Sequence, residues 1–501
     1  MKAIIPSFEE ARKLIESQPD GNILPVYKII FADLLNPFAA YLKLVDYYKD
    51  KSKYPGYSFL FESVKSDEKI GRYSLIGCDP YKIVISGEDK EIKGDPLIEI
   101  EKYLSQYNYI SVNGLPEFTG GAVGYISFDC VKYFEPRTAR KLKDPLGIPE
   151  SVHMYCKNVI IFDHLFQKIN VITHIKGDLK DSQVFKSEYE NALLKLDEMV
   201  EALTCDGVPL PDQVPITETN LSFKSNVGKE GYENFVNILK DNIKNGEIIQ
   251  AVPSQRLSRP TQLHPFNVYR YLRTVNPSPY LFYLDCADFQ VVGASPEMLV
   301  KVDLDNKVYT HPIAGTRRRG KTAAEDLALE KDLLSDIKET SEHVMLVDLG
   351  RNDVNRVAQP GTVKVDSLMH IEKYSHVMHI VSNVSGTLRE ECNRFDAFRS
   401  VFPAGTVSGA PKVRALELIG ELEGEKRGIY AGSVGHFDYS GGMDTCIAIR
   451  TMLFKDGYVH LQAGGGIVYD SVPLDEYNET LAKLSSNLAT IEKAEYYYMN
   501  E

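Results

Sequence analysis

Apolar positions recur at helical spacing in one part of the chain and as short strand-like runs in another. After residue 228, apolar side chains follow the spacing of one helix face: Tyr232, Val236, Leu239 and Ile243. Gly246 offers a C-terminal stop, so this pattern predicts a helix that ends there. The segment that follows, Ile248–Leu257, is predicted to be a strand.

Short runs separated by turn signals are typical of the chain before residue 204. Lys82–Ser86 and Asn158–Phe162 are predicted strands. Gly120–Tyr125 combines strand character with small residues, which indicates that another backbone approaches it closely. Because strands and helices are interspersed without a regular βαβ alternation, we expect an α+β fold.

A proline-rich polar stretch near residues 204–228 predicts an internal boundary. Pro209, Pro211 and Pro215 disfavour a helix or a central strand there. We therefore expect an N-terminal domain over residues 1–203, a linker over 204–227 and a second domain over 228–495.

Composition and charge exclude several classes of protein. The 501 residues include 57 Lys and Arg against 70 Asp and Glu, a net charge of −13, which argues against non-specific binding to nucleic acid. No apolar run approaches the roughly 18 residues of a membrane span. Seven scattered cysteines without a CxxC pair favour reduced thiols over a disulfide framework. With no targeting peptide apparent at the N-terminus, we expect a cytoplasmic protein.

Two acidic pairs at i, i+3 spacing are candidate metal ligands. Glu339 and Glu342 form the first pair, and Glu476 and Glu479 form the second. Either pair alone is more simply explained as a solvated helix face. If the pairs face each other, however, four clustered carboxylates require a cation or protons, and ligands made only of oxygen select Mg²⁺.

A run of three glycines is a candidate anion site. Gly464, Gly465 and Gly466 follow a strand-like run and would let backbone N–H groups approach a ligand, although a sharp turn is the simpler explanation. Arg450 lies in another alternating run, and an inward arginine needs a carboxylate partner on the protein or on a substrate.

Short motifs succeed one another along the chain in a characteristic order. They are FLFESV (59–64), NPSPYLFYL (276–284), GASPEM (293–298), PIAGTRRRG (312–320), SEHVMLVDLGRND (341–353), GTVSGAPK (405–412), QAGGG (462–466) and DEYNETLAK (475–483). Together they resemble the chorismate-utilising enzyme family over most of residues 25–495. The resemblance implies two interleaved lobes that form a β-sandwich flanked by helices, with the active site in the cleft.

The resemblance also assigns roles to residues of this sequence. Glu297 would be the general acid for the departing C4 hydroxyl of chorismate, and His379 would assist the leaving groups. The four glutamates Glu339, Glu342, Glu476 and Glu479 would hold Mg²⁺. Substrate contacts would come from a larger set: Gly315, Thr316, Thr406, Tyr430, Arg450, Gly464, Gly465, Gly466 and Lys483.

Two positions favour the anthranilate-forming branch of the family. Members that add water carry a lysine base where this chain has Gln250, which can orient ammonia. Many aminodeoxychorismate-forming members carry a nucleophilic lysine where this chain has Ala314. The expected reaction is therefore addition of ammonia at C2 followed by loss of pyruvate, which makes the enzyme a lyase in tryptophan biosynthesis. An aminodeoxychorismate-forming component and a non-catalytic tryptophan sensor are the alternatives.

The resemblance further implies two binding partners. No cysteine has the glycine-flanked setting of a glutaminase, so ammonia is expected from a separate glutamine amidotransferase subunit. The family's tryptophan-inhibitor site matches residues that a strand packed beside a proline-fixed turn would also explain: Ser63, Asn276, Pro279, Tyr280 and Leu281.

Overall fold

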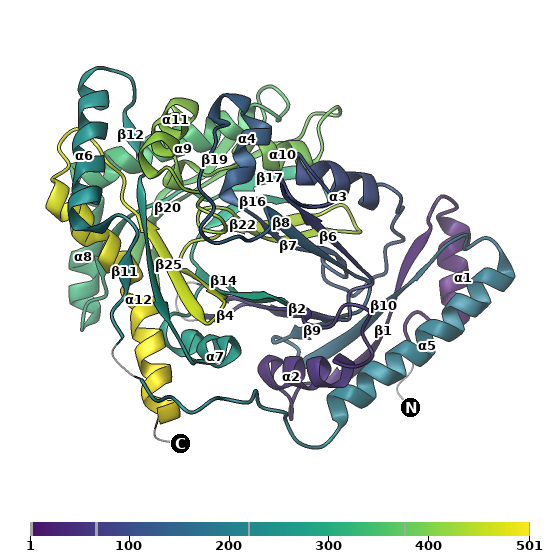
Figure 1. The fold of residues 1–501 in the computed structure, drawn as a ribbon. Coiled ribbons are helices and arrows are strands. Elements are labelled where there is room, and N and C mark those ends of the chain that lie inside the picture. Colours follow the sequence, from purple (N-terminus) through teal and green to yellow (C-terminus); the bar gives the residue numbers. More distant parts are fainter. Residues whose placement is uncertain (1–3, 66–68, 219–220, 375–376, 500–501) are drawn as a thin grey trace.

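Two large antiparallel sheets form the centre of the molecule, and helices surround them (Figure 1). The computed structural model describes residues 4–65, 69–218, 221–374 and 377–499. Within these ranges the sheets pack face to face, with α2 and α7 on the outer side of one sheet and α3 and α10 on the outer side of the other. The predicted α+β fold with a helix-flanked β-sandwich is confirmed.

Eleven strands of the described residues form the larger sheet, in which every pair is antiparallel. Strands from before the predicted linker make up one side of this sheet, and strands from after it, together with β11 from the end of the linker, make up the other. In spatial order they are β1 (Ile23–Phe31), β10 (Lys168–Lys176), β9 (Val159–Asp163), β5 (Tyr73–Cys78), β2 (Tyr57–Glu62), β14 (Tyr280–Cys286), β15 (Phe289–Ser295), β24 (Thr451–Lys455), β25 (Tyr458–Gly464), β13 (Ser254–Pro260) and β11 (Lys224–Ser225).

The second sheet likewise joins both parts of the chain. In spatial order it contains β18 (Ile313–Arg318), β20 (Val377–Thr387), β17 (Lys307–Thr310), β16 (Met298–Val302), β23 (Met443–Ile447), β22 (Ser433–Asp438), β7 (Gly121–Ile126), β8 (Ser151–Cys156) and β6 (Lys82–Ser86), with β19 (Lys364–Lys373) also paired to β20. In the described part of the chain, two short ladders lie apart: β12 (Gln250–Ala251) with β21 (Gly409–Ala410), and β3 (Val64–Lys65) with β4 (Lys69–Ile70).

The helices carry recognisable start signals, such as Ser7 in a capping box before the first helix and Asp336 before the ninth. Their bounds are α1 (Phe8–Ser17), α2 (Pro37–Tyr48), α3 (Pro96–Leu104), α4 (Val131–Phe134), α5 (Ser182–Thr204), α6 (Gly228–Lys244), α7 (Pro265–Val275), α8 (Ala323–Ser335), α9 (Ile337–Asn355), α10 (Arg394–Val401), α11 (Lys412–Glu423) and α12 (Pro473–Met499). Short 3-10 turns occur at η2 (Phe128–Cys130), η3 (Pro136–Thr138) and η4 (Gly405–Val407).

The close backbone approach predicted around Gly120–Tyr125 is confirmed in β7. A Cβ atom on Gly124 would lie 1.8 Å from the carbonyl oxygen of Val152, and one on Gly121 would lie 2.1 Å from that of Phe437. These neighbours belong to β8 and β22, the two strands between which β7 lies. Glycine is therefore required for this part of the second sheet to form.

The helix predicted before Gly246 is confirmed as α6, which buries Tyr232, Val236 and Leu239. The single strand predicted over Ile248–Leu257 is wrong. The chain instead forms β12 in a short ladder and then β13 in the larger sheet, with a break at Pro253. Proline has no N–H to donate to a ladder, and the break lets the chain change partner strands.

The predicted linker coincides with irregular backbone between Thr204, where α5 ends, and Lys224, where β11 begins. No helix or strand occurs over residues 205–218 and 221–223. Because both sheets combine strands from the two sides of this segment, the two parts are interleaved. The domain boundaries themselves remain a prediction from the sequence.

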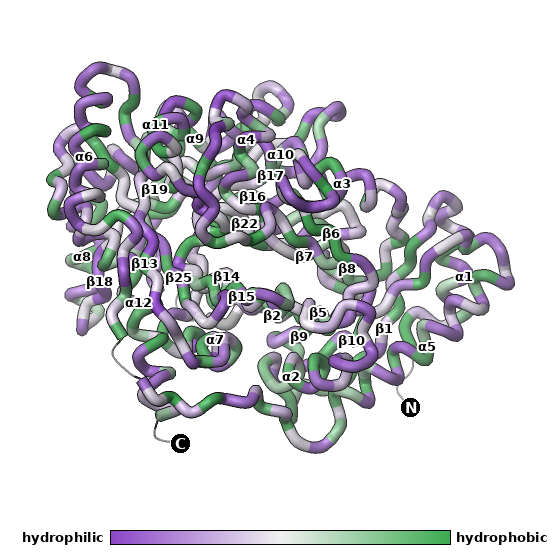
Figure 2. Tube along the Cα trace, in the orientation of Figure 1, coloured by the Kyte–Doolittle hydropathy of each residue, from purple (hydrophilic) through white to green (hydrophobic). Residues whose placement is uncertain are grey.

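Among the described residues, four short connections pass from one sheet to the other. β5 continues into β6, β8 into β9, β15 into β16, and β23 into β24. Hydrophobic stretches lie along the strands, whereas hydrophilic ones predominate in the outer loops (Figure 2). Among the described residues, no helix combines the length and apolar character needed to cross a membrane. The cytoplasmic location remains a prediction.

Candidate active site

The β15–β16 and β23–β24 connections between the sheets carry the predicted general acid and the predicted anion-binding arginine. Glu297 lies between β15 and β16, and Arg450, with a φ of 52°, lies just before β24. Their backbones are joined to the neighbouring connection: the N–H of Ala294 donates to the carbonyl of Arg450 at 3.2 Å, and the N–H of Ile447 donates to the carbonyl of Glu297 at 3.0 Å. The fold thus holds these two residues in one place.

Glu297 is set up to be a proton donor near neutral pH. Its residue is 6% exposed, and the hydroxyl of Thr406 donates to its Oε1 at 3.1 Å. Burial raises the pKa of Glu297 to about 8, although the Thr406 hydrogen bond acts in the opposite direction. A carboxyl group with this pKa is protonated at neutral pH and can transfer its proton.

Arg450 is a candidate anion-binding residue because its guanidinium lacks a protein partner. It is half-buried, and within the part of the chain that the structure describes no hydrogen bond or ion pair engages its side chain. Burial lowers the pKa of Arg450, which reflects the cost of keeping its charge away from water. An anionic ligand would remove that cost through a bidentate contact.

The glycine run lies at the end of β25 because neighbouring groups leave no room for side chains. A Cβ atom on Gly464 would lie 2.4 Å from the carbonyl oxygen of Pro253, and one on Gly466 would lie 2.4 Å from Nε2 of Gln250. Lys483 Nζ donates to the carbonyl of Gly464 at 2.9 Å. The run is therefore both a tight backbone approach and a wall of the site.

Tyr430 lies beside the first glycine of that run. A Cβ atom on Gly464 would lie 3.2 Å from its hydroxyl oxygen. Burial raises the pKa of Tyr430 to about 12, so its hydroxyl stays protonated and can donate a hydrogen bond. This position suits a contact to the same anion that Arg450 would bind.

The two acidic pairs meet at the glycine run. A Cβ atom on Gly465 would lie 3.0 Å from Glu476 Oε2, and one on Gly466 would lie 3.3 Å from Glu342 Oε1. Glu342 comes from α9 and Glu476 from α12, so the two helices bring their carboxylates to adjacent residues of one loop. The simpler explanation, a solvated face, is wrong for Glu476, which is 4% exposed.

Each of the four carboxylates has a protein donor. Their contacts are Arg317 Nη1 to Glu339 Oε1 at 3.2 Å, Gln250 Nε2 to Glu342 Oε1 at 2.8 Å, Ser471 Oγ to Glu476 Oε1 at 2.6 Å, and Lys483 Nζ to Glu479 Oε1 at 2.7 Å. Within the described ranges, no group of three or more acidic, histidine or cysteine side chains is close enough to hold a metal ion.

The carboxylates nevertheless fit Mg²⁺ in their chemistry. Oε2 of Glu476 is buried without a hydrogen-bond partner and lies beside Gly465. Burial raises the pKa of Glu476 and of Glu339. Burial also acts to raise the pKa of Glu479, but the ammonium of Lys483 and other nearby cations reverse its effect and lower that pKa. These oxygens would suit a hard cation once Lys483 releases Glu479 and Gln250 releases Glu342.

His379 is held in one tautomer. Its Nδ1 lies 2.9 Å from the carbonyl oxygen of Gly315 and 3.1 Å from the hydroxyl of Thr316. Because a carbonyl only accepts, the ring proton belongs on Nδ1, and Nε2 is left as an acceptor. Burial lowers the pKa of His379, which favours the neutral ring. Gly315 adopts a φ of +67°, a conformation that favours glycine.

Gln250 lies at the junction of the acidic and glycine-rich segments. Its side chain is buried, its Nε2 donates to Glu342, and its Oε1 has no hydrogen-bond partner. That unpaired oxygen can accept a hydrogen bond from a small nucleophile that enters the site.

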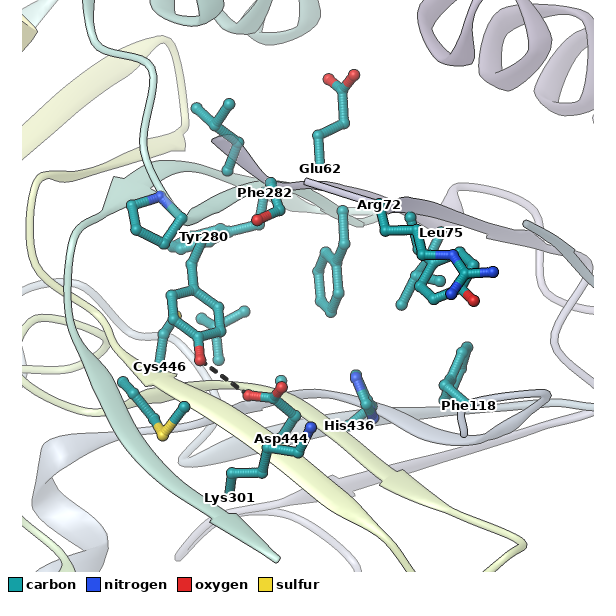
Figure 3. A pocket seen from close by; sticks show the side chains of 18 of the residues that line it. Glu62, Arg72, Leu75, Phe118, Tyr280, Phe282, Lys301, His436, Asp444 and Cys446 are labelled. Carbon is teal, nitrogen blue, oxygen red and sulfur yellow. Dashed lines mark hydrogen bonds between the residues drawn. The ribbon is translucent and has the colours of Figure 1, made fainter. Parts of the chain in front are cut away.

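Four of the five predicted inhibitor residues line a separate cavity of about 850 Å³ between the two sheets (Figure 3). Ser63, Pro279, Tyr280 and Leu281 lie on its wall. Asn276 caps the C-terminus of α7 and is outside the lining, so its inclusion in this site is not supported by the geometry. The turn at Pro279 does lie beside a strand, so the purely structural explanation for these residues also fits.

The facing wall of this cavity was missed by the sequence analysis. Lys301, His436 and Asp444 reach into it from β16, β22 and β23 (Figure 3). The hydroxyl of Tyr280 donates to Asp444 Oδ1 at 3.0 Å and so connects the two sheets across the cavity. No signal in the sequence joins these residues, because they belong to strands that are distant along the chain.

Comparisons with known proteins agree on one family. A family model described as "chorismate binding enzyme" matches residues 56–489. "Anthranilate synthase component 1" of Saccharomyces cerevisiae is 53% identical over 498 residues, which cover 98% of this chain and 97% of the yeast protein.

Solved structures show the same fold. "Anthranilate synthase component I from Streptococcus pneumoniae TIGR4" superposes with a TM-score of 0.73 at 38% identity, over 83% of this chain and 92% of that one. "MenF, the Menaquinone-Specific Isochorismate Synthase from Escherichia Coli" superposes with a TM-score of 0.68 at 17% identity, over 97% and 99%. The second similarity concerns the fold alone.

Proposed function

Because this chain belongs to the chorismate binding enzyme family, we propose that it is the large subunit of an anthranilate synthase. It converts chorismate and ammonia to anthranilate, pyruvate and water, in the first committed step of tryptophan biosynthesis. The observation that carries the proposal is that two connections joined by backbone hydrogen bonds bring together a buried, protonated Glu297 and an unpartnered Arg450.

The residues act on chorismate in a defined order. Arg450 and the hydroxyl of Tyr430 bind the carboxylate of the enolpyruvyl group, and the N–H groups of Gly464–Gly466 complete that contact. Ammonia, oriented by the free Oε1 of Gln250, adds at C2 while Glu297 protonates the departing C4 hydroxyl. Loss of the C2 proton with the enolpyruvyl group, assisted by neutral His379, then releases pyruvate and gives the aromatic ring, which makes the enzyme an oxo-acid lyase.

Gln250 and Ala314 distinguish this reaction from those of relatives. Neither side chain can deprotonate water or attack the ring, so added ammonia is the nucleophile that the site suits. Aminodeoxychorismate, a non-aromatic product, would indicate the alternative activity. A tryptophan sensor without catalysis would need neither Glu297 nor the four glutamates.

We also propose Mg²⁺ as the cofactor, held by Glu342 and Glu479 with Glu339 and Glu476 in support. The ion would neutralise the carboxylate on the ring of chorismate, a dianion that a protein of charge −13 otherwise repels. The free Oε2 of Glu476 and the oxygen-only donor set support this assignment.

Removal of divalent cations tests the cofactor. EDTA should abolish anthranilate formation, and added Mg²⁺ should restore it, whereas Ca²⁺ should restore it poorly because it favours a larger coordination shell. Full turnover in EDTA-treated, metal-free protein would rule out the ion.

Ammonia comes, in this proposal, from a glutamine amidotransferase subunit. The word "component" in the names of the yeast and Streptococcus relatives supports a partner. Free ammonia is mostly ammonium at neutral pH, so a coupled supply raises the reactive concentration. Anthranilate made from glutamine by the chain alone would contradict this part.

L-Tryptophan is proposed to inhibit the enzyme from the cavity between the sheets. The cavity has apolar residues on one wall, such as Leu75 and Leu281, and charged residues on the other, such as Lys301 and Asp444, which suits an aromatic amino acid. Its occupation would favour one arrangement of the two sheets over another.

One assay tests the main proposal. The purified chain is given chorismate, Mg²⁺ and ammonium at a pH near 8.5, with and without tryptophan, and anthranilate is followed by its fluorescence. Anthranilate that appears and is suppressed by tryptophan supports both activity and regulation. Chorismate consumed without anthranilate, or not consumed at all, contradicts the proposed reaction.

A further inference from the structure

Arg427 and Glu423 form a buried ion pair that none of the roles above uses. Their side chains are 1% and 6% exposed. Arg427 Nε donates to Glu423 Oε2 at 2.8 Å, and its Nη2 donates to Glu423 Oε1 at 2.7 Å, a bidentate contact. Glu423 is the last residue of α11, and Arg427 precedes β22.

The guanidinium also binds two backbone carbonyls that lie near candidate active-site residues in the chain. Arg427 Nη1 donates to the carbonyl of Val407 at 2.9 Å, and Nη2 donates to that of Val252 at 2.6 Å. Val407 directly follows Thr406, and Val252 lies two residues after Gln250. One side chain therefore joins the turn that carries Thr406 to the strand that carries Gln250.

The carboxylate extends this connection to the glycine run. Glu423 Oε1 accepts from the backbone N–H of Ser254 at 2.7 Å and from its hydroxyl at 2.9 Å. Ser254 pairs with Gly464 in the ladder between β13 and β25. Gln462, on the same strand as Gly464, donates to the Ser254 hydroxyl at 2.8 Å.

These contacts concern geometry more than stability. A buried ion pair contributes little net stability compared with apolar residues of the same volume, because both charges are removed from water. The planar fork of arginine, however, fixes several acceptors at set angles, which lysine cannot do. We propose that Arg427 and Glu423 are positioning residues that set Thr406, Gln250 and Gly464 for the reaction with chorismate, an inference that rests on the proposed function.

The test compares Arg427→Lys with a matched control, Arg259→Lys. Arg259 forms a similarly buried ion pair with Glu495, at 3% and 7% exposure, but it lies at the opposite end of β13 from Ser254 and joins that end to α12. Both variants keep the charge and lose the fork, so their losses in Tm should be similar. Glu423→Gln serves as a second variant if Arg427→Lys does not fold.

We expect kcat of Arg427→Lys to fall about tenfold or more, while KM for chorismate stays within about threefold, because misplaced groups lower the rate more than they lower binding. If the variant displaces Thr406 from Glu297, the pKa of Glu297 rises, and the alkaline limb of the pH–kcat profile should move to higher pH. Amide exchange over residues 250–254 and 405–409 should be faster than in Arg259→Lys.

The exchange measurement needs no turnover, so it tests positioning even if the wild-type chain makes no anthranilate, a result that would refute the proposed function alone. The inference is overturned if Arg427→Lys matches Arg259→Lys in amide exchange and, where the wild type is active, also in kcat and pH profile. The pair would then be a purely structural contact.

Discussion

At the scale of single residues, the site depends on side chains held in unfavourable electrostatic states. Glu297 is kept neutral by burial, and Arg450 is kept charged without a partner. Both states cost free energy in the empty protein. The reaction uses both states, because the substrate accepts a proton from Glu297 and places a carboxylate on Arg450.

Glu297→Gln should lower kcat by about 10²–10⁴-fold, because the amide has no proton to transfer. In the wild type, the acid is active below its pKa of about 8 and is lost as pH rises through that value. The alkaline limb of the pH–kcat profile should therefore lie near pH 8. A limb unchanged in the Gln variant would show that another group is the acid.

Arg450→Lys should raise KM for chorismate about tenfold or more, since an ammonium cannot form the bidentate contact to a carboxylate. Arg259→Lys, in which the altered arginine is paired and remote from the glycine run, is the control and should leave KM unchanged. Steady-state kinetics at saturating ammonium distinguish the two. Equal KM values would remove Arg450 from substrate binding.

At the scale of elements, the glycine run lets α9 and α12 meet at one loop. The Cβ position of Gly465 is next to Glu476 of α12, and that of Gly466 is next to Glu342 of α9 and to Gln250. Each of the three glycines therefore has a close neighbour that a side chain would meet. A turn alone would not require all three.

Gly466→Ala should lower activity about a hundredfold with little loss of helix content, because the added methyl group displaces Gln250 by steric overlap. Gly231→Ala, within α6, is a suitable control because its Cβ would lie 3.3 Å from Val227 and the change favours helix. Circular dichroism and turnover are measured for both. Normal turnover in Gly466→Ala would contradict the proposed crowding.

Sequence patterns predicted the fold class, the helix that buries Tyr232 and the close approach at Gly124. They failed at Pro253, where a missing N–H lets the chain change partner strands. The assignment of Asn276 to the inhibitor site stays a prediction, because this residue caps a helix outside the cavity lining. They also missed Asp444, because its approach to Tyr280 depends on how two sheets stack. The spacing of residues along the chain predicts helices, strands and caps. Contacts across the sandwich depend on how the whole chain folds, so local spacing does not predict them.

At the scale of the molecule, the cavity between the sheets lies apart from the glycine run, but part of its wall is formed by the segment that carries Glu297. Pro296 and Met298, on either side of Glu297, line the cavity. A ligand there would contact the segment that carries the acid. Regulation at this place therefore requires no long route through the protein.

Asp444→Asn should raise the tryptophan concentration for half-inhibition about tenfold or more, because a buried carboxylate is a strong partner for an ammonium group. Basal kcat should stay within about twofold, since Asp444 does not contact the glycine run or the acidic pairs. Asp348→Asn, on the exposed side of α9, is the control. Unaltered inhibition in Asp444→Asn would exclude this wall from the inhibitor site.

The interleaving of the two sheets has a consequence for biosynthesis on the ribosome. β2 and β7 emerge early, but their neighbours β14 and β22 belong to the second half of the chain. At typical elongation rates these strands wait on the order of tens of seconds with one edge unpaired. Unpaired edges recruit other chains, so nascent copies of this protein should depend on chaperones until β22 leaves the ribosomal tunnel.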